Sequence, residues 1–132
     1  MICLLDTSAL LAHFRAESGA SRVQAIFDDL ESSILVASIT ITEFSRRMRE
    51  LGATHGEINE ALHGYKRRLS EVVATDRAIA QAAFTLGLRA SARLPMADAL
   101  IDAAAANRSA ILVHRDPHFS ALPPGALEQE ML

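Results

Sequence analysis

The sequence predicts an α/β domain built on a mainly parallel sheet of four to five strands. Short apolar runs at residues 1–5, 34–37, 71–74 and 110–113 are typical of buried strands. Segments with apolar residues at helical spacing alternate with these runs, and that alternation favours parallel strands joined by helices. Acidic residues also lie just after these runs or early in the helical segments, where ligands bind in open α/β sheets.

The first half of the chain is expected to contain two strands and three helices. Helical spacing of apolar residues predicts helices over residues 7–16 and 20–31. After the second strand, Thr40 as N-cap and Glu43 three residues later fit a capping box. The helix that they open is expected to stop at Gly52.

The second half is expected to repeat the alternation. A helix over residues 56–69 precedes the third strand, and Thr75 or Asp76 then caps a helix that Gly87 ends. Pro95 suits the first turn of the next helix. A fourth strand follows that helix, and the C-terminal tail is expected to add a short edge strand.

Length and composition limit the class of protein. The 132 residues suffice for one domain, expected to span residues 1–132, and 50% of them are hydrophobic. Cys3 is the single cysteine and lies in an apolar run, so no internal disulfide forms and a reducing cytoplasm is expected. No apolar stretch reaches the ~18 residues that would cross a membrane. The net charge of -3 argues against a general nucleic-acid binder, although bases cluster at residues 46–49 and 66–68.

Four acids lie just after a predicted strand or in the first turns of a predicted helix, and we call them the carboxylate quartet: Asp6, Glu43, Asp98 and Asp116. Each alone has a structural explanation as a helix cap, a capping-box residue, a first-turn acid or a turn residue. Together they are expected at the carboxyl edge of the sheet, where their charges would repel without a hard cation. Oxygen ligands of this kind suit Mg²⁺ or Mn²⁺.

Asp102 is an additional acid four residues after Asp98, so both side chains are expected on one side of a helix. Two like charges at this spacing cost a few tenths of a kcal/mol, which favours a nearby cation or basic group. Asp102 is therefore expected to support the site.

Four segments, in this order, resemble the successive motifs of PIN-domain proteins, and the short chain resembles a VapC-type toxin of a toxin–antitoxin pair. They are LLDTSAL at 4–10, ITEF at 41–44, LPMADALI at 94–101 and LVHRDPHF at 112–119. The resemblance implies a three-layer α/β/α fold and a Mg²⁺- or Mn²⁺-dependent ribonuclease. It also implies an RNA substrate, a homodimer and a cognate VapB-type antitoxin that blocks the site.

The resemblance assigns roles within the quartet. Asp6 and Asp98 match the acids most directly tied to the metal, and the remaining two acids match the other members. Thr7 or Ser8 matches a hydroxyl beside the site. The implied reaction is hydrolysis of an RNA phosphodiester by a water that one or two cations activate.

Three basic residues are weaker candidates for contact with substrate: Arg46, Arg115 and His114. His114 stands where many family members carry Thr or Ser, and a solvent-facing histidine at a strand end is its simpler interpretation.

Other functions remain open at this stage. The alternative to an enzyme is a non-catalytic PIN-fold binding protein whose acidic pocket holds a basic peptide. A P-loop motif is absent. An aspartyl phosphatase commonly has a second Asp two residues after the first, where this chain has Ser8.

Overall fold

Five parallel strands form one sheet, in agreement with the expected α/β class. The computed structural model describes residues 1–132. The strand order is β3-β2-β1-β4-β5, and all four pairings are parallel. The strands are β1 (Ile2–Leu5), β2 (Ser33–Ala37), β3 (Glu71–Val73), β4 (Ile111–His114) and β5 (Gln129–Met131). The short edge strand expected in the C-terminal tail is thus present as β5.

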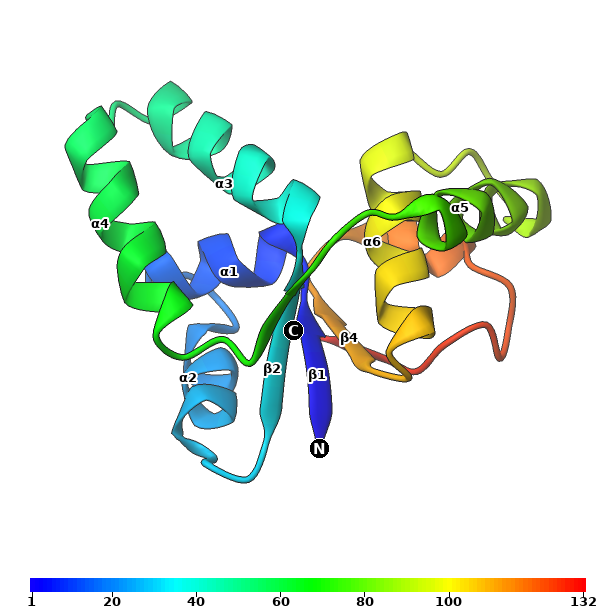
Figure 1. Ribbon diagram of the computed structural model, residues 1–132, viewed down its shortest axis with the longest axis horizontal. Coiled ribbons are helices and arrows are strands. Elements are labelled where there is room, and N and C mark those ends of the chain that lie inside the picture. Colours follow the sequence, from blue (N-terminus) through cyan, green and yellow to red (C-terminus); the bar gives the residue numbers. More distant parts are fainter.

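Helices cover both faces of the sheet, which gives the three layers that the resemblance implied (Figure 1). They are α1 (Thr7–Phe14), α2 (Ala20–Asp28), α3 (Ser38–Glu50), α4 (His55–Lys66), α5 (Arg77–Arg89) and α6 (Met96–Asn107), with a 3₁₀ helix η1 (Pro117–Ala121). Helices α1 to α4 lie on one side of the sheet, and α5 and α6 lie on the other (Figure 1). The helices are too short or too polar to cross a lipid bilayer.

Alternation along β1 assigns its side chains to the two cores. Cys3 and Leu5 face the core that α1 to α4 cover, and Leu4 faces the core beneath α5 and α6. All three are fully buried. Burial of a leucine of this kind contributes roughly 1.5–3 kcal/mol, so β1 anchors both layers.

The helix that carries Glu43 begins earlier than expected. Strand β2 ends at Ala37, which is itself the N-cap of α3, and no side chain caps this helix. Thr40 is buried inside the helix, so the predicted capping box of Thr40 and Glu43 is wrong. Without a connecting loop, the chain passes from strand to helix too early for Thr40 to act as a cap. The true capping box joins Thr54 and Glu57 at the start of α4.

Two helix boundaries in the second half also differ from expectation. Asp76 caps α5 as predicted, but the helix continues through Gly87 to Arg89. Glycine only weakens a helix, and nothing in the backbone forces an end at this position. Pro95 is the N-cap of α6 and precedes its first turn by one residue.

The strand order reverses beside β1. The chain moves outward from β1 to β2 and β3 on one side, and β4 lies on the other side of β1. In open α/β sheets, ligands bind outside the carboxyl ends of the strands at such a reversal of strand order. The segments after β1 and β4 therefore lie where ligands bind in folds of this kind.

Candidate functional site

Asp6 follows β1 and is held at the first turn of α1. Its Oδ1 accepts hydrogen bonds from the Ala9 N–H at 2.9 Å and the Ser8 hydroxyl at 2.6 Å. Only 2% of Asp6 is exposed, and burial is the main reason that its pKa rises to about 7. The two hydrogen bonds oppose this rise, while the charges of Asp116 and Asp98 add to it. Asp6 is thus both a helix cap, which was the structural explanation of its position, and a member of an acidic cluster.

Ser8 connects the segments that follow β1 and β4. While its hydroxyl donates to Asp6, its oxygen accepts the backbone N–H of Arg115 at 2.8 Å. The loop after β4 is thereby tied to the start of α1. This link holds Asp116, the next residue, beside Asp6.

Glu43 reaches the cluster from α3, and Thr7 holds it. The Thr7 hydroxyl donates to Glu43 Oε1 at 2.6 Å, the length of a hydrogen bond to an ionised carboxylate. Thr40 Oγ1 lies 3.3 Å from the same hydroxyl. The threonine expected to cap the helix instead lies buried against Thr7.

Asp98 opens α6 and lies close to three other charged groups. Burial is the largest cause that raises its pKa, which reaches about 6. The charges of Asp116 and Glu43 raise the pKa further, and His118 lowers it. All members of the quartet therefore interact electrostatically, either with Asp98 or with Asp6.

His118 joins the cluster, and the sequence reasoning assigned it no role. Its Nδ1 lies 2.8 Å from Asp116 Oδ1 and 3.5 Å from Asp98 Oδ2. One ligand atom from each of these three residues lies within 4.8 Å of the others. The signal in the sequence was its position two residues after Asp116, but many surface histidines lie as close to an acid.

Asp102 is completely buried one turn beyond Asp98, and neither of its carboxyl oxygens has a hydrogen-bond partner. A buried polar group without a partner costs roughly 1–3 kcal/mol, and more if it is charged. Burial, followed by the charges of Asp98, Asp6 and Asp116, raises the pKa of Asp102 to about 8. The carboxyl group of Asp102 is therefore within reach of the charges of Asp98, Asp6 and Asp116.

The three basic candidates lie in different environments. Arg46 is exposed on α3, one turn after Glu43. The Arg115 guanidinium donates to Glu17 and to the Ser18 carbonyl, so it points toward the loop after α1. His114 is 3% exposed, which contradicts the expectation of a solvent-facing histidine.

The burial of His114 has a physical explanation. The pKa of its imidazole is lowered mainly by burial, and Nε2 lies 3.0 Å from Gln129 Oε1. Nδ1 accepts the Asp116 N–H at 3.2 Å. Strand β5 covers the end of β4 and removes this ring from solvent, and the tail sequence gave only a weak signal for that strand.

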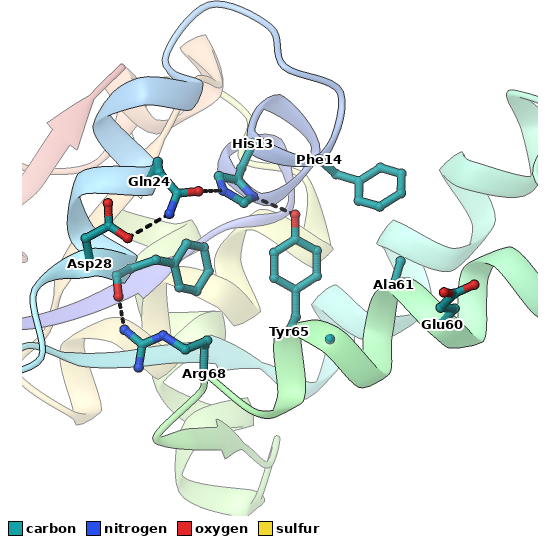
Figure 2. A pocket seen from close by; sticks show the side chains of 10 residues that line it. His13, Phe14, Gln24, Asp28, Glu60, Ala61, Tyr65 and Arg68 are labelled. Carbon is teal, nitrogen blue, oxygen red and sulfur yellow. Dashed lines mark hydrogen bonds between the residues drawn. The ribbon is translucent and has the colours of Figure 1, made fainter.

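A cavity of about 510 Å³ lies away from the quartet, between α1, α2 and α4 (Figure 2). A chain of hydrogen bonds crosses it from Tyr65 to His13, from His13 to Gln24, and from Gln24 to Asp28. Since Gln24 uses its amide N–H₂ on Asp28, its oxygen accepts from His13 Nε2, and His13 Nδ1 accepts from the Tyr65 hydroxyl. None of the quartet lines this cavity.

Fold and site together define a class, the α/β proteins with a cluster of carboxylates at the carboxyl edge of a parallel sheet. The chain belongs to the PIN domain family, whose model matches residues 3–123. Comparison with curated proteins finds no match.

Solved structures share the fold over nearly the whole chain. VapBC2 from Rickettsia felis, bound to a promoter DNA fragment, is similar with a TM-score of 0.77 and 18% identity, over 100% of this chain and 99% of that chain. DNA-bound VapBC from Salmonella typhimurium gives 0.75 and 19%, over 99% and 98%. VapC20 from Mycobacterium tuberculosis, described as a Sarcin-Ricin loop cleaving toxin, gives 0.72 and 14%, over 92% and 94%.

Proposed function

We propose that the chain, as a single domain over residues 1–132, is a metal-dependent endoribonuclease that acts as the toxin of a toxin–antitoxin pair. The observation that carries this proposal is the gathering of the carboxylate quartet at the carboxyl edge of β1 and β4. The charge of Asp116 raises the pKa of both Asp6 and Asp98, and the charge of Glu43 raises that of Asp98. Membership of the PIN domain family supports it. So does the similar fold of VapC20, which is described as a toxin that cleaves the Sarcin-Ricin loop.

The donor set fits a hard divalent cation. The quartet supplies carboxylate oxygens, the type of ligand that Mg²⁺ and Mn²⁺ take. Asp102 supports the fit, because a buried carboxylate without hydrogen bonds is stabilised by positive charge nearby. We propose that Asp6, Asp98, Asp116 and Glu43 hold Mg²⁺ or Mn²⁺. Such a cation supplies a Lewis acid and lowers the pKa of bound water.

The residues around the quartet have separate tasks in this proposal. Ser8 fixes Asp6 through its hydroxyl, and Thr7 fixes the carboxylate of Glu43. Glu43 or Asp116 is the carboxylate that orients the attacking water or takes its proton. Burial of Asp6 and Asp98 keeps bulk water from screening these charges.

RNA is the proposed substrate, and Arg46 is the proposed contact to its phosphates. The side chain is exposed one turn from Glu43, so it is placed to meet a backbone that crosses the cluster. Arg115 and His114 are not proposed for this role, because their contacts lie within the protein.

A VapB-type antitoxin is the proposed inhibitor, and the cavity of Figure 2 is its proposed docking place. Aromatic side chains line it, with Phe14 42% exposed, and large aromatic surface is typical of protein interfaces. Several structures with this fold are described as VapBC complexes. In this chain, Phe14→Ala is expected to weaken capture of the antitoxin while RNA cleavage persists.

A homodimer is also proposed, through the outer face of α5 and α6. Phe84, Leu88 and Met96 are each at least 70% exposed there and line one apolar surface, and a contiguous exposed apolar patch marks an interaction site. Light scattering tests this contact. The wild type should have twice the mass of one chain, and Phe84→Lys should have the mass of a single chain.

The test of the activity compares the wild type with Asp98→Asn, each freed of any antitoxin, on purified RNA with Mg²⁺, Mn²⁺ or chelator. Glu50→Gln, which also removes one negative charge but lies exposed on α3, is the matched control. Cleavage by the wild type and the control that requires cation and is lost in Asp98→Asn supports the proposal. A folded wild type that leaves RNA intact while it binds a basic peptide in the acidic cluster would favour the non-catalytic binding protein.

The toxin role needs a separate readout. Expression of the wild type in a bacterial host is expected to stop growth, and expression of Asp6→Asn is expected to allow it. Equal growth with both proteins would contradict the toxin role without touching the nuclease activity measured in solution.

A further inference from the structure

We propose that His118 is a protein ligand of the cation and makes the site prefer a transition-metal ion such as Mn²⁺ to Mg²⁺. This inference rests on the proposed metal-dependent function, and it concerns a side chain outside the carboxylate quartet.

The position of the imidazole nitrogen suits a ligand. His118 Nδ1 lies 2.8 Å from Asp116 Oδ1 and 3.5 Å from Asp98 Oδ2. Neighbouring ligands of an octahedral ion with bonds of about 2.1 Å are about 3 Å apart. The two distances from Nδ1 are therefore close to the spacing of adjacent positions around one ion. All three ligand atoms lie within 4.8 Å of one another.

The loop after β4 holds this arrangement in place. Asp116 is the N-cap of η1, and its Oδ1 accepts the His118 backbone N–H at 2.9 Å. Pro117 occupies the start of η1 and fixes the backbone between the two ligand residues. Main chain and side chain of His118 thus both contact Asp116, so little freedom remains to be lost when a cation binds.

The exposure of the ring allows the tautomer that a ligand needs. The His118 side chain is 55% exposed, so its Nε2 can carry the proton and bond to water. Here Nδ1 lies 2.8 Å from Asp116 Oδ1, the distance of an N–H donor to a carboxylate oxygen. A bound cation would replace this contact, and Nδ1 would then present its lone pair to the space that it shares with Asp98 and Asp116.

Asp102 gives an independent indication that a cation belongs here. Its carboxyl group is completely buried, lacks any hydrogen-bond partner and lies beside Asp98, Asp6 and Asp116. The basic side chain of His118 contacts Asp98 and Asp116. It forms no hydrogen bond to Asp102. A cation within the cluster would stabilise Asp102 in a way that His118 alone does not.

A nitrogen ligand changes which cation is preferred. Mg²⁺ takes oxygen ligands and gives up its waters reluctantly, whereas imidazole is a common ligand of first-row transition metals. A quartet of carboxylates alone would discriminate weakly between Mg²⁺ and Mn²⁺. The addition of His118 is expected to strengthen the binding of Mn²⁺ more than that of Mg²⁺.

The experiment measures cation binding without RNA. Mn²⁺ and Mg²⁺ are titrated calorimetrically into wild type, His118→Gln and His118→Asp, and electron spin-echo spectroscopy of the Mn²⁺-loaded proteins reports a directly bound ¹⁴N. His55→Gln, a replacement of an exposed histidine at the start of α4, is the matched control.

In His118→Gln, we expect the affinity for Mn²⁺ to fall by about tenfold or more, the usual scale for a lost partner at a metal site. The affinity for Mg²⁺ should fall less, and the ¹⁴N signal should disappear. His118→Asp should restore a ligand but favour Mg²⁺, and the control should behave as the wild type.

An unchanged ratio of Mn²⁺ to Mg²⁺ affinity in His118→Gln, or a ¹⁴N signal that persists, would overturn the inference. Cation-dependent RNA cleavage by that variant would then leave the proposed function standing. A folded wild type that binds neither cation would overturn both proposals.

Discussion

Replacement of Asp102 by asparagine tests the electrostatics of the acidic cluster in the metal-free protein. In the folded protein the pKa of the Asp102 carboxyl group is about 8, above its usual value of 3.8. The folded protein therefore retains a proton that the unfolded chain releases between those two pH values. Because the native state binds more protons there, the contribution of Asp102 to stability falls as the pH rises from about 4 to about 8.

The magnitude follows from proton linkage. One extra bound proton changes the free energy of unfolding by about 1.4 kcal/mol per pH unit. Asparagine has no such proton. Between pH 5 and pH 7, the free energy of unfolding of Asp102→Asn should therefore rise by roughly 1 to 3 kcal/mol relative to that of the wild type. The unpaired buried amide adds a penalty that does not vary with pH, so only the slope is interpreted.

Urea unfolding in chelator at several pH values measures this slope. Glu50→Gln, an exposed replacement on α3, serves as the control and should run parallel to the wild type. Parallel curves for Asp102→Asn and the wild type would refute the reasoning, because they would mean that the folded state does not raise the pKa of Asp102.

Three further predictions concern the site and one helix. Thr7→Val removes the hydrogen bond to Glu43 and should slow RNA cleavage by about 10- to 100-fold, with an unchanged unfolding midpoint as the check on the fold. Cation at 100 times the dissociation constant that it has at pH 8 should stabilise the protein by about 2.7 kcal/mol at that pH, measured by thermal unfolding. The same concentration should stabilise it less at pH 5, because Asp6 and Asp98 must release protons to bind the cation. Thr54→Ala removes the capping box of α4 and should cost about 1 kcal/mol in urea unfolding while cleavage stays normal.

The sequence predicted the layout of the fold because that layout depends on patterns within short segments. Apolar runs located the strands, and helical spacing located the helices on either side of Gly19. Boundaries that depend on the connection between elements were harder. Thr40 followed by Glu43 has the composition of a capping box, but β2 passes directly into α3, so the box could not form there.

The candidate site was predictable to a similar degree. The topology of a parallel sheet brings the ends of β1 and β4 together, so the proximity of Asp6 and Asp116 followed from the order of elements. The burial of Asp102 and the contacts of His118 depend on side-chain packing between α6 and η1. The burial of His114 depends on β5, and no local pattern in the segment that contains it encodes that contact.

The central claim is that these carboxylates cleave RNA with the help of a divalent cation. Its most direct test is to incubate purified wild type and Asp6→Asn with total cellular RNA, with Mn²⁺ or Mg²⁺ and with chelator, and to sequence the new RNA ends. We predict discrete new ends that require cation and the Asp6 carboxylate. Intact RNA after incubation with a folded, antitoxin-free, cation-loaded wild type, or the same ends with Asp6→Asn, would contradict the account.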